Sequence, residues 1–279
     1  MFPSIDYYSF TIPIRAPFGE IDHESIAFAI NSFTTLISAD HSHKFGVGSW
    51  GVEQAKGFYS IRLRHEVSGV ALSIGTVNAH VFCELSGRAC GNLDAIEQLT
   101  PIIKATYIHC SRIDFAIDIL TDEDPERFSA LRNGRAFKSN GTINSPSGKT
   151  CYFGSRSSER MARVYRYNEP HPRAALLRVE AEYKGGAAKV AAEHLLETTL
   201  FQACLDAHHP FGWKHPDWKP DGYTGEKLPY KSYNPSNAST VRWLYGDVIT
   251  ALRKAINEGL VELDDWLSVL AGDKGETAE

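Results

Sequence analysis

The sequence lacks the short motifs by which many nucleotide- and metal-dependent enzymes are assigned. It contains no Walker loop, no dinucleotide-binding GxGxxG pattern, no GxSxG and no HExxH. Its five cysteines are scattered, odd in number and without a CxxC pair. That spacing argues against a disulfide framework and against a zinc knuckle. We therefore expect reduced cysteines in the core of a cytoplasmic protein.

Long hydrophobic runs are also absent. No stretch of about 18 apolar residues occurs, so we expect neither a transmembrane helix nor a membrane partner. The first residues lack the basic and long apolar regions of a signal peptide. The net charge of −5 argues against a protein that coats nucleic acid non-specifically, although it leaves room for a local basic groove.

What the chain does contain is a series of short strand-like runs. Segments rich in β-branched and aromatic residues recur at 5–14, 57–85, 107–120 and 149–184. Helices are expected in four segments of the first 207 residues: from Asp22, over 93–103, from Asp124 to about Phe137, and over 187–207. Strands outnumber helices without strict alternation, which predicts an α+β fold with a central antiparallel sheet flanked by helices.

Composition divides the chain into three expected parts. Residues 1–207 would form the core, and 208–237 a connector dense in Pro, Gly and aromatics. Residues 238–279 would form a C-terminal helical annex with an acidic tail. Within the core, the Gly/Ser/Asn-rich segment 139–149 is expected to be a loop.

Two strand-like segments each carry a pair of carboxylates on one face. In a strand, residues i, i+2 and i+4 share a face, while their apolar neighbours fill the core side. The four carboxylates are Asp114, Asp118, Glu180 and Glu182. A divalent cation with oxygen ligands would compensate such a cluster. Salt bridges would do so equally well, and this alternative stays open; its partners would be Arg112, Arg163 and Arg178.

A basic, tyrosine-bearing stretch overlaps these strands. Between Arg135 and Lys184 lie ten cations and four anions, a local charge of +6. Arg163, Tyr165 and Tyr167 alternate on one face of a strand that follows a Gly-Ser-Arg-Ser-Ser turn. Arginines and turn amides are suited to phosphate oxygens. The alternative is a solvated basic face with no ligand.

The histidines give a weaker signal. His41 and His43 imitate a His-hydrophobe-His metal motif, but a serine stands between them in a loop-like context. His208 and His209 have no partner at metal-ligand spacing. We therefore expect neither pair to form a metal site.

In order and spacing, six segments together resemble the replication initiation factor family (Rep_trans), which includes rolling-circle plasmid initiators, filamentous-phage initiators and related mobile-element relaxases. The matching segments are IDYYSFT (5–11), CELSGRACGNL (83–93), SRIDFAID (111–118), GKTCYFGSRSSERMARVY (148–165), LRVEAEYKG (177–185) and VRWLYGDVITAL (241–252).

The resemblance implies a relative of the His-hydrophobe-His (HUH) nickases in which carboxylates take over much of the metal binding. The tyrosine of the family's Arg-Ile-Tyr-Asp-Lys signature corresponds to Tyr165, preceded by Arg163. Arg166 and Tyr167 replace the usual Asp and Lys, so Tyr165 and Tyr167 both remain candidates for the nucleophile. The implied metal ligands are Asp114, Asp118, Glu180 and Glu182. The expected DNA contacts are Arg156, Arg160, Arg166 and Tyr167.

The implied chemistry is metal-dependent nicking of single-stranded or extruded origin DNA. Mg²⁺ or Mn²⁺ would polarise the scissile phosphate while Arg163 or Arg156 stabilises negative charge. Tyrosine attack would give a 5′-phosphotyrosine and a free 3′-hydroxyl for a host polymerase, with a host helicase and a homodimer as further expected partners. A DNA-binding replication-control protein without nicking activity and a mobile-element relaxase are the alternatives.

Overall fold

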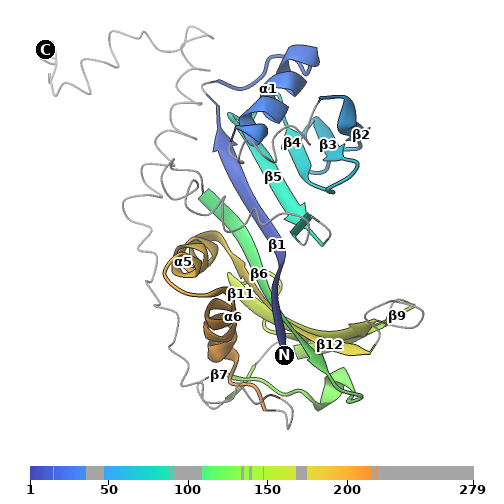
Figure 1. Cartoon of the computed structure of the whole chain (residues 1–279), viewed down its shortest axis with the longest axis vertical. Helices are drawn as coiled ribbons and strands as arrows, with labels where there is room; N and C mark the ends of the chain where they lie inside the picture. The colour runs from blue at the N-terminus through green and yellow to red at the C-terminus, as the bar shows by residue number, and fades with distance from the viewer. Residues whose placement is uncertain are drawn as a thin grey trace, which may run out of the picture. The chain divides into compact units, whose positions relative to one another are not determined.

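The computed structural model describes residues 1–14, 16–35, 47–87, 89–90, 109–132, 135–137, 140–146, 148–167, 175–214 and 218. All of them belong to one compact unit, Met1–Tyr230. Within these residues, ten strands form one sheet in the order β2-β3-β4-β5-β1-β6-β12-β11-β10-β9 (Figure 1). All neighbouring pairs are antiparallel. The α+β architecture with a central antiparallel sheet is thus confirmed.

The strands of the sheet are β1 (Phe2–Pro13), β2 (Trp50–Glu53), β3 (Ile61–His65), β4 (Ala71–Ile74), β5 (His80–Ser86), β6 (His109–Leu120), β9 (Asn140–Ser145), β10 (Gly148–Phe153), β11 (Arg160–Tyr167) and β12 (Leu176–Lys184). A separate pair consists of β7 (Leu131–Arg132) and β8 (Arg135–Ala136). Short 3₁₀ turns are Val47–Ser49, Pro125–Arg127 and His209–Phe211. The helices are α1 (His23–Thr34), α5 (Gly185–Leu195) and α6 (Leu200–His208).

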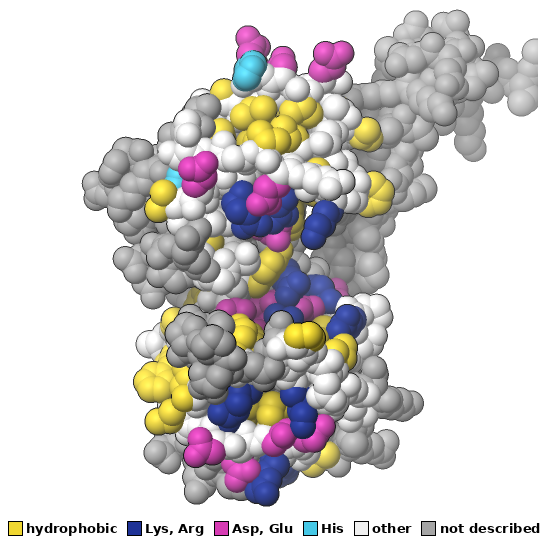
Figure 2. All heavy atoms as spheres, turned by 90° about the vertical axis from the view of Figure 1, so that its right-hand side faces the viewer, with side chains coloured by type: hydrophobic (Ala, Val, Ile, Leu, Met, Phe, Trp, Pro, Cys, Tyr) yellow, Lys and Arg dark blue, Asp and Glu magenta, His cyan; other side chains and the backbone are white. Residues whose placement is uncertain are grey.

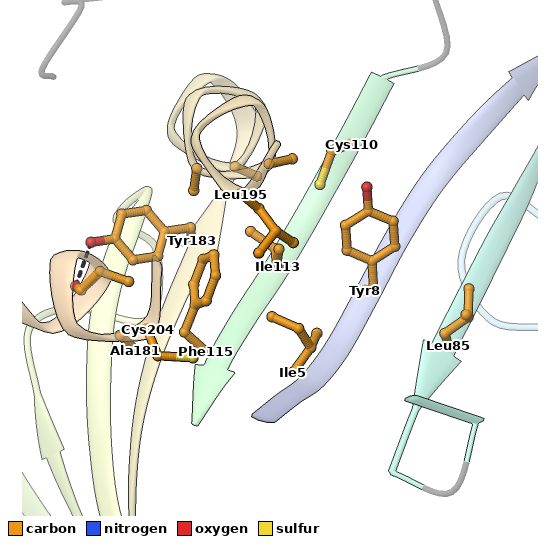
Figure 3. Close-up of a cluster of buried hydrophobic side chains, with 14 of the residues drawn as sticks. Ile5, Tyr8, Leu85, Cys110, Ile113, Phe115, Ala181, Tyr183, Leu195 and Cys204 are labelled. Atoms are coloured by element: carbon orange, nitrogen blue, oxygen red, sulfur yellow. Dashed lines mark hydrogen bonds between the residues drawn. The ribbon is translucent and has the colours of Figure 1, made fainter. Parts of the chain in front are cut away.

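The central strands have one apolar and one polar face, as the period of two predicts. Ile113 and Phe115 of β6 and Ala181 of β12 are buried together, beneath α5 and α6 (Figure 3). The hydroxyl of Tyr183 donates to the carbonyl oxygen of Ala207 in α6 at 2.6 Å, so its polar end is satisfied within the core. We call the other side the polar face; it carries Tyr7, Asp114, Glu180, Tyr165 and Thr150.

Side-chain caps explain where the helices begin. Asp22 accepts a hydrogen bond from the backbone N–H of Ser25 and caps α1 as predicted. The segment expected as one helix over 187–207 is divided into α5 and α6. Thr199 accepts from the N–H of Gln202 and starts α6 afresh, so the second helix has its own cap. No helix among the described residues is long and apolar enough to cross a membrane.

Three expectations about local structure are wrong. Segment 139–149 is largely β9 and the start of β10; every residue of β9 is exposed, so no apolar alternation marks this edge strand. The helix expected after Asp124 ends after one 3₁₀ turn, because Ser129 pairs its backbone with Lys214. The expected connector begins inside the core, where Phe211 and Trp213 are buried. The helix expected over 93–103, the expected C-terminal helices and the His41–His43 loop lie outside the described residues.

Candidate active site

Tyr165 and Glu180 are brought together by the pairing of β11 with β12. Arg163 lies directly opposite Glu180 in that register, and Tyr165 lies two residues further along the same face. The Tyr165 hydroxyl donates to Oε2 of Glu180 at 3.0 Å. The guanidinium of Arg163 donates to the other carboxylate oxygen, Oε1. Glu180, whose side chain is fully buried, is therefore held by one phenol and one guanidinium.

The surroundings of Tyr165 keep its phenol protonated. Burial raises the pKa of Tyr165 well above its ordinary value of 10, and the negative charge of Glu180 raises it further. A phenolate is therefore disfavoured here unless a neighbouring group accepts its proton. Glu180 is the group already in position to accept it.

Two more carboxylates lie beside this pair and share a second arginine. Arg112 donates to both oxygens of Asp114, with Nε 2.8 Å from Oδ1. The same guanidinium lies 2.7 Å from Oε2 of Glu182. Arg163 reaches within 3.7 Å of Asp114 and so joins the two groups. Burial raises the pKa of Asp114, and Glu180 adds to the rise, whereas Arg112 opposes it.

Asp118 belongs to a different cluster on the same face. Register places it opposite Arg178, which donates from Nε and from a terminal nitrogen to its two oxygens, both at 2.7 Å. Arg178 also binds Asp6 at the bulge of β1. The strand alternation that unites Asp114 and Asp118 is as predicted, but each aspartate binds its own arginine.

The arrangement matches the salt-bridge interpretation of these carboxylates. Each of the four is engaged by a guanidinium, and Glu182 also lies 2.7 Å from the ammonium of Lys184. The part of the chain that the structure describes contains no group of three or more His, Cys, Asp or Glu placed to hold a metal ion. As they stand, these residues do not fit a divalent cation.

Tyr165, one of the two tyrosines that the sequence left open, is hydrogen-bonded to a carboxylate in the site. Tyr167 packs edge-on against it, with ring centroids 5.4 Å apart and an interplanar angle of 85°. This contact makes Tyr167 an aromatic neighbour of Tyr165.

The three arginines expected to contact DNA lie on different sides of the sheet. Arg156 is exposed in the β10–β11 turn, with its guanidinium 4.6 Å from the ring centroid of Tyr152. Arg160 lies over the ring of Tyr183, on the apolar side. Arg166 donates to the backbone carbonyls of residues 121 and 123. The structure therefore does not bring Arg160 to Tyr165, whereas Arg166 lines the same hollow as Tyr165.

Tyr165 borders a hollow of about 310 Å³ that is also lined by three other residues predicted for the site, Arg163, Arg166 and Tyr167. The residues of β10 that line it were not predicted. Thr150, Gly148 and Tyr152 of β10 contribute to it together with Tyr165 and Tyr167. The signal that could have found them is the β10–β11 hairpin, because counting back from its turn pairs Thr150 with Tyr165.

A second polar group that sequence reasoning missed extends from the site across the sheet. Arg112 lies over the ring of Tyr7, 4.3 Å from its centroid. The Tyr7 hydroxyl donates to Glu84 at 2.8 Å, and Glu84 also binds Arg62. Figure 2, which views the right-hand side of Figure 1, shows acidic and basic side chains side by side at mid-height. The polar face is thus lined with paired charges.

Comparison with known proteins bears on this fold. No model of a known protein family matches the chain, and no curated protein matches it. A solved structure of a Rolling Circle Replication Initiator Protein from Geobacillus stearothermophilus is similar, with a TM-score of 0.52 and 15% identity. The match covers 81% of this chain and 91% of that one. The chain therefore shares the fold of that structure, an α+β fold built on one large antiparallel sheet.

Proposed function

We propose that this protein initiates rolling-circle DNA replication by nicking single-stranded origin DNA with Tyr165. One observation carries the proposal: the Tyr165 hydroxyl is hydrogen-bonded to the buried carboxylate of Glu180, on the polar face of the sheet and beside a hollow. The likeness of the fold to a rolling-circle initiator supports the same function.

The proposed reaction is a transesterification. Glu180 accepts the phenol proton as Tyr165 attacks the phosphorus, and the bond from phosphorus to the 3′ oxygen breaks. The 3′ oxygen takes a proton from solvent, which leaves a 3′-hydroxyl and a 5′-phosphotyrosine. Because the phosphodiester is conserved in the covalent adduct, a 3′-hydroxyl can later attack it and rejoin the strand.

Arg163 is the cation best placed to act on the phosphate. It binds Glu180 and lies over the Tyr165 ring, 5.7 Å from its centroid. A phosphate at the Tyr165 hydroxyl would compete with Glu180 for this guanidinium. We infer that Arg163 stabilises charge on the non-bridging oxygens during attack.

Dependence on Mg²⁺ or Mn²⁺ stays a prediction from the sequence. The four carboxylates hold arginines in this structure, so we assign no step of the reaction to a metal. Asp114 and Glu180, which Arg163 links, are the carboxylates to test first as ligands.

The test is covalent capture from a pool of random-sequence single-stranded DNA, with Mg²⁺, with Mn²⁺ and with a chelator. The proposal predicts a DNA–protein adduct that survives denaturation, with the DNA on the peptide containing Tyr165. DNA binding without any adduct would favour the replication-control alternative. An initiator and a mobile-element relaxase share this chemistry and are distinguished by the origin they act on.

A further inference from the structure

We propose that the hollow beside Tyr165 holds the base of the nucleotide adjacent to the scissile phosphate, unstacked from the strand. This inference rests on the proposed function and names a base-binding subsite of the same site. Its occupant is a single nucleobase of single-stranded DNA.

The hollow exists because small side chains of β10 lie opposite large side chains of β11. In the β10–β11 register, Thr150 pairs with Tyr165 and Gly148 pairs with Tyr167. Gly148 has φ +136°, a conformation that other residues rarely adopt, so this position is reserved for a residue without a side chain. Tyr152, two residues beyond Thr150 on the same face of β10, also lines the hollow. We call Gly148 and Thr150 the floor of the hollow, which Tyr152, Tyr165 and Tyr167 also line.

Size and chemistry suit one nucleobase. The volume of about 310 Å³ is at the small end of ligand pockets, which span roughly 300–1,000 Å³. Tyr152, Tyr165 and Tyr167 offer aromatic rings on which a base can stack. Ser145 and Thr150 line the same space and carry hydroxyl groups that can bind the polar edge of a base. Three charged residues, Asp6, Arg163 and Arg166, complete the lining.

The position of the hollow determines which nucleotide can place its base there. The scissile phosphate must approach the Tyr165 hydroxyl, and the Tyr165 side chain also lines the hollow. A base reaching this space therefore belongs to a nucleotide adjoining that phosphate. Turning one base out of the stack fixes the register of the strand, and it is easiest in single-stranded DNA.

Photocrosslinking tests the subsite without requiring cleavage. The probe is a random-sequence single-stranded DNA pool in which thymine is replaced by 5-iodouracil, bound to full-length protein carrying Tyr165→Phe. We expect crosslinked peptides that carry the DNA on Tyr152 or Tyr167. Thr150→Trp, which fills the floor, should lower that yield about tenfold, as expected for the loss of one stacked base. The matched control Thr150→Ser should stay within about twofold of the parent.

Tyr152→Leu is the second variant if Thr150→Trp does not fold; it should remove the Tyr152 crosslink and lower the total yield. Crosslinks confined to other residues, or an unchanged yield with the floor filled, would overturn the subsite. Covalent nicking of the unmodified pool by the wild-type protein is measured in parallel. A wild-type protein that nicks but gives no crosslink at these tyrosines refutes the subsite alone. Crosslinks without nicking refute the proposed function and leave a nucleobase-binding site that has no link to a scissile phosphate.

Discussion

The hydroxyl of Tyr165 lies 3.0 Å from Oε2 of Glu180, and Arg163 binds the other oxygen of the same carboxylate. The group that would attack and the group that would accept its proton are thus already in contact before DNA binds. Burial and the charge of Glu180 both raise the pKa of the phenol, so a proton acceptor is needed near neutral pH.

Glu180→Gln should therefore slow adduct formation by about 10²- to 10⁴-fold, the usual contribution of a general base. The amide also removes the negative charge that raises the pKa of Tyr165, so the phenol ionises more readily in the variant. Its residual rate should then rise with pH, by up to about tenfold per unit. Single-turnover rates between pH 7 and 9 measure both effects.

Glu182→Gln is the matched control for Glu180. Glu182 lies on the same strand face but binds Arg112 and Lys184 instead of Tyr165. This variant should keep most of the wild-type rate. Equal losses in the two variants would show that the carboxylates act together and that Glu180 has no special role.

Arg156 and Arg160 provide a paired test of the DNA path. Arg156 is exposed at the β10–β11 turn, whereas Arg160 packs over Tyr183 on the apolar side. Arg156→Ala should weaken binding to all single-stranded sequences and reduce the slope of log affinity against log salt by about 0.7. Arg160→Ala should leave that slope unchanged. The reverse pattern in salt titrations would move the DNA to the other side of the sheet.

Asp118 is predicted to stabilise the fold through Arg178. Arg178 is only 2% exposed and donates to both oxygens of Asp118, with Asp6 as its further partner. Asp118→Asn removes one of the two carboxylates that compensate the buried Arg178 guanidinium. The free energy of unfolding should therefore fall by about 3 kcal/mol. Denaturant unfolding measures this, and unchanged stability would rule out the structural role.

His208 should make stability depend on pH below neutrality. Burial lowers its pKa to about 3, and its two ring nitrogens are engaged by the Phe115 carbonyl and the Trp213 indole, both at 3.2 Å. In the unfolded chain His208 binds a proton below about pH 6.5, whereas in the folded chain it stays neutral there. Stability is therefore complete above pH 6.5 and falls below it, by at most about 1.4 kcal/mol per unit.

Unfolding between pH 7 and pH 5 tests this dependence, with His208→Gln as the control. The control should be less stable at pH 7 but should vary less with pH. A wild-type stability that stays flat over this interval would contradict the buried, neutral state of His208.

Much of the site follows from strand alternation, which the sequence reveals directly. The period of two predicts that Asp114 shares a face with Asp118, and Tyr165 with Tyr167, as observed. What alternation leaves undetermined is register between distant strands. Only the pairing of β12 with β6 places Arg178 opposite Asp118 and Glu182 opposite Asp114, so the division into two clusters could not be predicted.

The edge of the sheet and the aromatic segment after α6 were harder to predict. The strand Asn140–Ser145 is exposed on both faces, so its sequence resembles a loop although its backbone pairs with β10. Trp213 lies in a Pro/Gly-rich segment, yet it packs on Phe153, with ring centroids 5.3 Å apart. The composition of a segment does not reveal which residues it contacts, because those residues lie far away in the sequence.

The most direct measurement of the central proposal is mass mapping of the covalent DNA adduct in three proteins: wild type, Tyr165→Phe and Tyr167→Phe. We predict that wild type carries the DNA on Tyr165 and that Tyr167→Phe keeps most of the adduct. Tyr165→Phe should form none while binding DNA almost as tightly, because it lacks only the attacking oxygen. An adduct on Tyr167, or one that persists in Tyr165→Phe, would contradict the assignment of Tyr165 as the nucleophile.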